Sequence, residues 1–304
     1  MPKPAKSVLE LIGNTPLLRL KALETPRSAQ VLAKLESLNP GGSIKDRAAL
    51  AMIEDAEARG LLHLGMTIVE PTGGNMGISL AMVGAAKGYQ VAITMPDGVP
   101  LERRRLVARF GATAHLTPSD LGMEGAIRLA RRMVERDSNM VMLDQFSNAA
   151  SVTAHRDGTG PEILKATRGR VDAFVAGVGT GATITGVGEA LKTASPSTLV
   201  VAVEPSTSPL LSQGWAGEHG IVGIGADFVP AILNRTLIDE VVTISTEEAV
   251  ETTRRLGREM GLLVGISSGA NALAALRIAQ RLGAGKVVVT VLPDTGERYP
   301  MLTA

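Results

Sequence analysis

Short apolar runs alternate with longer segments of helical periodicity along most of the chain. The runs are rich in Val, Ile and Leu, and several are apolar at every position, which is typical of parallel strands buried on both faces. They predict strands at residues 31–36, 67–70, 90–95, 112–116, 140–143, 173–176, 199–203, 241–244 and 286–292.

Between these runs, apolar residues recur at the spacing of amphipathic helices, and Gly or Pro follows most of the segments. Helices are predicted at residues 48–59, 76–87, 101–110, 124–136, 184–192, 247–260 and 271–282. This alternation predicts an α/β fold with parallel sheets. Ligands bind such sheets beyond the carboxyl ends of the strands, so the loops that follow strands are the candidate sites.

The size of the chain, 304 residues, is enough for one or two domains. Small and turn-forming residues gather at 147–160, in Ser-Asn-Ala-Ala-Ser and Asp-Gly-Thr-Gly-Pro, and predict a domain boundary there.

Composition excludes several classes of function. The 31 basic and 30 acidic residues nearly balance, and aromatic residues are only 2 %, so neither nucleic acid nor an anionic membrane is an expected partner. The chain has no Cys, and its four His are scattered, so we expect no metal site. The N-terminal residues lack the apolar core of a signal peptide, and no apolar run is long enough for a membrane span. We expect a soluble cytoplasmic protein.

Three glycine-rich loops follow predicted strands and open predicted helices. The first, at 38–47, carries Lys45; the others are Thr-Gly-Gly-Asn-Met-Gly at 72–77 and Gly-Val-Gly-Thr-Gly-Ala-Thr at 177–183. An isolated lysine at a helix start is usually a solvated surface residue, but burial and the helix dipole would lower its pKa and make it a nucleophile. One reactive amine with two anion-binding loops suits pyridoxal 5'-phosphate (PLP), an aldehyde cofactor that carries a phosphate.

Each of the two downstream loops has a competing interpretation. The loop at 72–77 offers backbone N–H groups to a carboxylate and the Asn75 amide to a cofactor oxygen, or it is a plain turn in which Asn75 caps the next helix. The loop at 177–183 offers a phosphate site at a helix N-terminus. It lacks the Gly-Lys-Ser/Thr of a P-loop, but Glu204 ends the next strand, so a dinucleotide site competes.

Gly-Ile-Ser-Ser-Gly at 265–269 matches the nucleophile elbow of α/β-hydrolases. In those enzymes a histidine follows the serine, whereas the last histidine here is His219. Ser267 therefore fits better as a neutral hydrogen-bonding group.

Taken together, these motifs resemble the cysteine synthase (O-acetylserine sulfhydrylase) family of fold-type II PLP enzymes, to which cystathionine β-synthases are close. The matching segments are residues 12–17, 39–47, 70–78, 94–96, 101–104, 145–146, 159–162, 177–186, 203–205, 265–270 and 292–299. The resemblance implies two open twisted α/β domains, a smaller mobile one at 48–151 and a larger one formed by 1–47 and 152–304, with PLP in the cleft between them.

The resemblance also implies the roles of single residues. Lys45 would form the Schiff base with PLP and act as catalytic base and acid. The other cofactor-binding positions are Asn75, Gly179, Thr180, Gly181, Ala182, Thr183 and Ser267. The substrate carboxylate would lie against Thr72, Gly73, Met76 and Gln145. The implied reaction is β-replacement on O-acetyl-L-serine by sulfide, giving L-cysteine and acetate in cysteine biosynthesis. A homodimer and a serine acetyltransferase partner are also implied.

Two departures from the family pattern fall in the substrate loop, where Gly73 replaces a usual Ser and Met76 a usual Thr. They leave three alternatives open. The donor could be O-phosphoserine or serine, the nucleophile could be homocysteine, thiosulfate or an amine, or the protein could be a weakly catalytic PLP-binding homologue. The sequence does not indicate which residues form the dimer interface.

Overall fold

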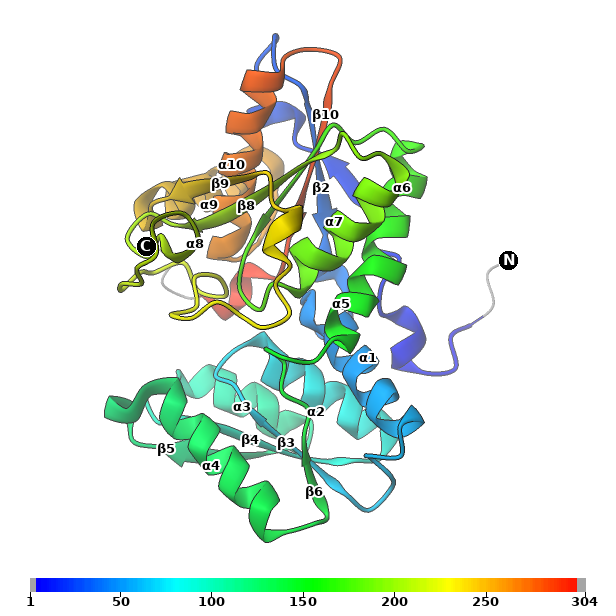
Figure 1. Ribbon diagram of the computed structural model, residues 1–304, viewed down its shortest axis with the longest axis vertical. Helices are drawn as coiled ribbons and strands as arrows, with labels where there is room; N and C mark the ends of the chain where they lie inside the picture. The colour runs from blue at the N-terminus through cyan, green and yellow to red at the C-terminus, as the bar shows by residue number, and fades with distance from the viewer. Residues whose placement is uncertain (1–3, 300–304) are drawn as a thin grey trace. The chain divides into compact units, whose positions relative to one another are not determined.

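The computed structural model describes residues 4–299 and divides into two α/β units (Figure 1). The larger unit contains residues 13–38 and the chain from Val152 onward, and the smaller contains residues 39–151 with the segment that ends at Ile12. Each unit has one sheet, and all but one of the neighbouring strand pairs are parallel. The predicted α/β class with parallel sheets is confirmed.

The sheet of the larger unit has the strand order β1-β2-β10-β7-β8-β9, and only β1 runs antiparallel to its neighbour. The strands are β1 (Leu17–Arg19), β2 (Gln30–Leu35), β7 (Ala173–Gly177), β8 (Leu199–Pro205), β9 (Glu240–Ile244) and β10 (Val287–Leu292).

Alternate residues of these strands enter two different cores, as the period of two in a strand requires. Val175 and Val288 pack in the core that contains α9 (Thr246–Met260) and α10 (Ile266–Leu282). Phe174 and Val289 pack in the core that contains α6 (Gly160–Thr167) and α7 (Ala182–Ala194). Helices therefore cover both faces of the larger sheet, which is why its central strand β7 is apolar at every position.

The sheet of the smaller unit is fully parallel, in the order β5-β4-β3-β6. On one face, α1, α2 and α3 share a core with Ile68 and Ile93; on the other, Ala130 of α4 packs on Val69 and Ala92. The elements are α1 (Lys45–Ala58), β3 (Thr67–Pro71), α2 (Asn75–Lys87), β4 (Gln90–Pro96), α3 (Leu101–Arg109), β5 (Thr113–Thr117), α4 (Gly122–Arg136) and β6 (Met140–Met142).

All the predicted strands are present, with ends that shift by at most two residues. The sequence patterns missed β1, which is only three residues long, and the helical stretch from residue 150 to 167. That stretch comprises α5 (Ala150–Ala154), a π-helical turn (His155–Thr159) and α6. Gly158, Gly160 and Pro161 conceal it, because these residue types predict loops.

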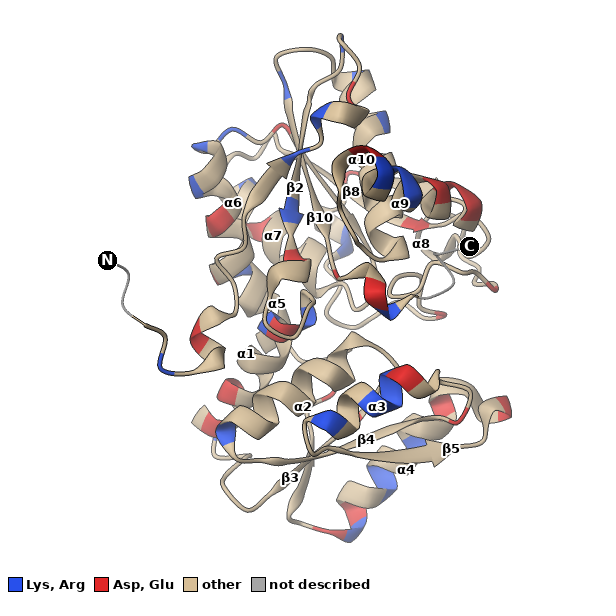
Figure 2. Ribbon diagram, turned by 180° about the vertical axis from the view of Figure 1, so that it is seen from behind, with Lys and Arg blue, Asp and Glu red and all other residues tan. Residues whose placement is uncertain are grey.

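Charges of both signs are interspersed over the helices of each unit (Figure 2). On α9 and α10, for example, Arg277 pairs with Glu248, while Arg281 of α10 pairs with Glu240 of β9. Within residues 4–299, no helix is long and apolar enough to cross a membrane, and no group of His, Asp and Glu has the arrangement of a metal site.

Candidate active site

In the smaller unit, the predicted substrate residues gather at a topological switch point. Strand β3 has β4 on one side and β6 on the other, and the ligand crevice of an open α/β sheet forms where neighbouring strands diverge in this way. Thr72 follows β3 and Gln145 follows β6. The Gln145 Nε2 group donates to the Pro71 carbonyl at 3.4 Å, so the two loops are in contact.

The loop after β3 leads into α2 without a side-chain cap at the start of that helix. The Thr72 N–H donates to the Thr94 carbonyl at 3.0 Å, and the Thr72 hydroxyl accepts from the Gly74 N–H at 3.2 Å. Gly74 is the N-cap and supplies no side-chain oxygen, and α2 begins at Asn75 itself. The interpretation of Asn75 as the cap of this helix is therefore wrong. An uncapped helix N-terminus suits an anionic group.

Gly73 and Met76 mark how this loop differs from the usual family pattern. A Cβ atom on Gly73 would lie 2.7 Å from Val99 Cγ2, so Val99 occupies the space of any side chain at this position. Arg103 Nη1 donates to the Gly73 carbonyl at 3.3 Å. The Met76 side chain is only 2 % exposed and packs in the core of the smaller unit. At position 76, only the backbone is left for a ligand.

Sequence reasoning missed Glu70, the fully buried carboxylate at the end of β3. It accepts the backbone N–H groups of Asp144 and Gln145, both at 2.9 Å. Burial raises the pKa of Glu70 to about 7, although these two hydrogen bonds favour the charged form. An acidic residue that ends an otherwise apolar strand was the available signal, because such a residue needs hydrogen-bond donors inside the protein.

Lys45 is the first residue of α1, in agreement with its predicted position at the start of a helix. The turn before it is held by Asp46, whose carboxylate accepts the Gly41 N–H and the Ser79 hydroxyl, each at 2.6 Å. Ser79 belongs to α2, so Asp46 ties the helix that carries Lys45 to the helix that begins at Asn75. Asp46 is itself fully buried, and its hydrogen bonds fix the positions of the neighbouring turn and of α2.

In the larger unit, the loop from Gly177 to Thr183 also lies at a switch point, because β7 has β10 on one side and β8 on the other. The Gly177 N–H donates to Asn271 Oδ1 at 2.8 Å and fixes the start of the loop. Gly181, with φ of +85°, is the N-cap of α7 and supplies no side-chain oxygen. The N–H groups of the first turn, with the hydroxyls of Thr180 and Thr183, therefore fit a phosphate.

Ser267 lies close to this loop through Gly223. A Cβ atom on Gly179 would lie 2.4 Å from the Gly223 carbonyl oxygen, and one on Gly223 would lie 4.0 Å from Ser267 Oγ. Ser267 is 3 % exposed. A neutral hydroxyl that lies beside this loop fits the ring nitrogen of PLP as a hydrogen-bond partner.

The position of Glu204 argues against the dinucleotide interpretation. Its carboxylate accepts the N–H groups of Leu211 and Ser212, at 2.7 and 3.1 Å, and the Ser212 hydroxyl. The carboxylate is thus committed to the first turn of α8 (Leu210–Gln213) rather than directed at a ribose.

A sequence model of the family described as pyridoxal-phosphate dependent enzymes matches residues 8–294. The chain belongs to this family. Within it, the chain is 48 % identical to a cysteine synthase of Staphylococcus aureus, over 98 % of this chain and 96 % of the relative. The predicted family and its PLP cofactor are therefore confirmed.

Solved structures of similar enzymes show the same fold. An O-ureido-L-serine synthase superposes with a TM-score of 0.95 at 45 % identity, over 98 % of this chain and 94 % of its own. A cysteine synthase from Entamoeba histolytica has a TM-score of 0.93 at 39 % identity, covering 98 % and 91 %. An O-acetylserine dependent cystathionine β-synthase from Helicobacter pylori has a TM-score of 0.93 at 36 % identity, covering 99 % and 98 %.

Proposed function

We propose that this PLP-dependent enzyme catalyses β-replacement on O-acetyl-L-serine by sulfide, which yields L-cysteine and acetate. The observation that carries the proposal is the uncapped N-terminus of α7 beside the buried Ser267 hydroxyl, in a chain similar over its whole length to cysteine synthases. When bound, the cofactor supplies the electron sink for loss of the α-proton and the β-substituent.

The residues of the larger unit would orient the cofactor. The loop at Gly179, Thr180, Gly181, Ala182 and Thr183 would bind its phosphate through N–H and hydroxyl donors. Ser267 would meet the ring nitrogen with a neutral hydroxyl. A hydroxyl stabilises a protonated ring less than a carboxylate would, and this favours prompt loss of the β-substituent over other chemistry at the α-carbon.

The residues of the smaller unit would handle the substrate. Lys45 Nζ would hold the aldehyde carbon of the cofactor and take the α-proton of the amino acid. The Asn75 amide would bond to the ring oxygen. Thr72, Gly73, Gln145 and the backbone at Met76 would bind the substrate carboxylate, with the first turn of α2 adding its partial positive charge.

The same proposal includes a homodimer, a serine acetyltransferase partner and a cytoplasmic location, which the family resemblance supports. It also includes the predicted division at residues 48 and 151, with the smaller part moving when substrate binds.

A second candidate is β-replacement with a different donor or nucleophile. The apolar Val99 contact at Gly73 and the buried Met76 favour it, because both remove hydroxyl groups from the substrate loop. The similarity to an O-ureido-L-serine synthase is as extensive as that to cysteine synthases. The donors to compare are O-acetylserine, O-phosphoserine and serine, and the nucleophiles are sulfide, thiosulfate, homocysteine and amines.

The test is the visible absorption spectrum of the purified protein, before and after O-acetyl-L-serine is added, followed by product analysis with sulfide. We expect a cofactor band that shifts on addition of the donor, and L-cysteine as product. Lys45→Ala should abolish turnover, whereas the exposed Lys165→Ala should not. Full turnover by Lys45→Ala would refute the proposal. A band that ignores O-acetylserine but responds to another donor would select the second candidate.

A further inference from the structure

The π-helical turn His155–Thr159 packs unusually close to α7, the helix that follows the phosphate loop. A Cβ atom on Gly186 of α7 would lie 2.3 Å from the Val152 carbonyl oxygen, and one on Gly160 would lie 2.4 Å from Ala190 Cβ. Because glycine has no Cβ atom, its presence at both positions lets the backbones of the two helical segments lie close together. π-Helical turns often occur at functional sites, and the turn here carries the side chains of His155 and Thr159.

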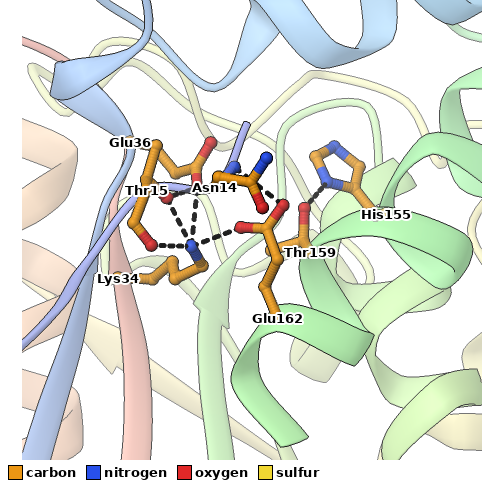
Figure 3. Close-up of polar contacts among 7 residues, drawn as sticks. All are labelled: Asn14, Thr15, Lys34, Glu36, His155, Thr159 and Glu162. Carbon is orange, nitrogen blue, oxygen red and sulfur yellow. Dashed lines mark hydrogen bonds and ion pairs between the residues drawn. The ribbon is translucent and has the colours of Figure 1, made fainter. Parts of the chain in front are cut away.

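His155 bonds with both of its ring nitrogens, and Figure 3 shows the bond to Thr159. Nδ1 lies 2.9 Å from the Thr159 hydroxyl, and Nε2 lies 3.3 Å from the hydroxyl of Thr183 in the first turn of α7. His155 is 2 % exposed and Thr159 is fully buried, so water does not compete for these bonds. Among the described residues, His155 is the hydrogen-bond partner of the Thr183 hydroxyl.

The donor roles in this chain follow from the role of Thr183. A phosphate dianion only accepts hydrogen bonds, so Thr183 must direct its single hydroxyl proton at the phosphate. The Thr183 oxygen is then left as an acceptor, and His155 Nε2 must carry the proton that it accepts. If the ring is neutral, Nδ1 has no proton and accepts from Thr159. The buried Thr159 hydroxyl can donate to Nδ1, so its bond is compatible with the tautomer in which Thr183 donates to the phosphate.

The segment that carries His155 is anchored to β2 by an ion pair between the partly exposed Glu162 and the buried Lys34. Glu162, three residues after Thr159, accepts the Asn14 N–H at 2.9 Å and lies 2.5 Å from Lys34 Nζ (Figure 3). Lys34 is 1 % exposed and also bonds to the hydroxyl and the carbonyl of Thr15. Charge-assisted hydrogen bonds are stronger than neutral ones, so this ion pair helps to fix the helical segment that carries His155.

We propose that His155 is a positioning residue for the cofactor phosphate. Its Nε2–H donates to the Thr183 hydroxyl and thereby turns the Thr183 proton toward the phosphate, while the Thr159 hydroxyl donates to Nδ1. The inference rests on the proposed function, because it takes Thr183 as a phosphate ligand.

Two substitutions of His155 distinguish the effect of its bond to Thr183 from that of its bond to Thr159. The amide of His155→Gln reaches about as far as Nε2 and can still donate to Thr183, whereas that of His155→Asn reaches only the Nδ1 position and keeps the Thr159 bond. Both remove the ring, so a loss due to packing would affect both. We expect PLP to bind His155→Asn about tenfold more weakly than wild type, the effect of about one hydrogen bond, and His155→Gln within about threefold.

Thr183→Val provides the matched background, because it removes the hydroxyl on which His155 is proposed to act. In that background, His155→Asn should weaken PLP binding no further, whereas removal of the ring should still lower the thermal stability of the apoprotein. Equal PLP affinity of wild type and His155→Asn would overturn the inference alone. Wild-type protein that does not bind PLP would overturn the proposed function and the inference with it.

The tautomer is directly measurable by NMR of protein labelled with ¹⁵N-histidine. Only four histidines are present, and the signals of His155 are those lost in His155→Gln. We expect a proton on Nε2 in holoprotein. A neutral ring protonated on Nδ1 would contradict the proposed direction of both hydrogen bonds.

Discussion

Glu70 Oε1 accepts a hydrogen bond from the Gln145 N–H at 2.9 Å. Its second oxygen accepts from the Asp144 N–H at the same distance. One buried carboxylate therefore joins the carboxyl ends of β3 and β6 at the switch point of the smaller sheet, where the proposed substrate residues lie. The two loops cannot separate without leaving a buried carboxylate without its donors, which is costly.

The pKa of Glu70, raised to about 7 by burial, predicts how stability varies with pH. Between its ordinary pKa of 4.5 and about 7, the folded protein holds a proton that the unfolded chain releases. The stability from this group is therefore fully present below pH 4.5 and is lost as the pH rises through 7. This contribution to the free energy of unfolding is on the order of 3 kcal/mol.

Urea unfolding at pH 5 and pH 8 tests this prediction. In Glu70→Gln, the loss of stability between the two pH values should shrink by this amount, because the amide does not titrate. Glu57→Gln is the control in the same unit, since the pKa of Glu57 is lowered, against its burial, by bonds from Lys87 and Tyr89. That substitution should leave the loss between pH 5 and pH 8 unchanged. An equal loss in wild type and Glu70→Gln would contradict the assignment.

Restoring a serine at position 73 should conflict with Val99. The Cβ–Cγ2 distance of 2.7 Å requires Val99 to move, and a β-branched side chain has few rotamers available. Gly73→Ser should destabilise the protein by about 1 to 3 kcal/mol and raise the KM for the amino-acid donor. In Gly73→Ser/Val99→Ala, the stability loss should be smaller than the sum of those of the single variants. Strict additivity in this double-mutant cycle would show that the two positions are independent.

Met76→Thr should act on the core of the smaller unit. The substitution removes buried volume and adds a hydroxyl among apolar neighbours, so we expect a loss of about 2 to 4 kcal/mol. Met76→Leu, which nearly conserves volume, should cost less than about 1.5 kcal/mol. Thermal unfolding with donor kinetics on the same samples separates stability from binding. A lower KM in Met76→Thr without loss of stability would show that this position faces the substrate.

Two glycines of α7 should respond in opposite ways to the same substitution. Gly186→Ala places a methyl group 2.3 Å from the Val152 carbonyl oxygen and 2.7 Å from the Arg156 nitrogen, and neither backbone atom can move alone. We expect a loss of at least about 1 to 3 kcal/mol. At Gly188, the nearest atoms are Val200 methyls at 3.6 Å, so Gly188→Ala should be neutral or add up to about 1 kcal/mol through helix propensity. Chemical denaturation of the two variants compares them, and similar losses would refute the close approach at Gly186.

The strand predictions succeeded where the pattern was unambiguous. Strands β7 and β10 lie between two layers of helices, and all of their residues except Thr290 are apolar, so their residues directly indicate burial on both faces. The helical stretch from residue 150 to 167 was missed because Gly158, Gly160 and Pro161 oppose a helix locally. Packing against the glycines of α7 outweighs that propensity.

The sequence by itself determined the α/β class, the loops that follow strands, and the identity of Lys45, Asn75, Thr183 and Ser267 as candidates, because glycine patterns and strand periodicity are local properties. Only the tertiary structure decided that Met76 is a core residue, that Val99 fills the space beside Gly73, and that Glu70 and His155 support the candidate loops. These relations join residues up to 75 positions apart. They depend on which strands become neighbours and which helix faces meet, and no local pattern encodes that.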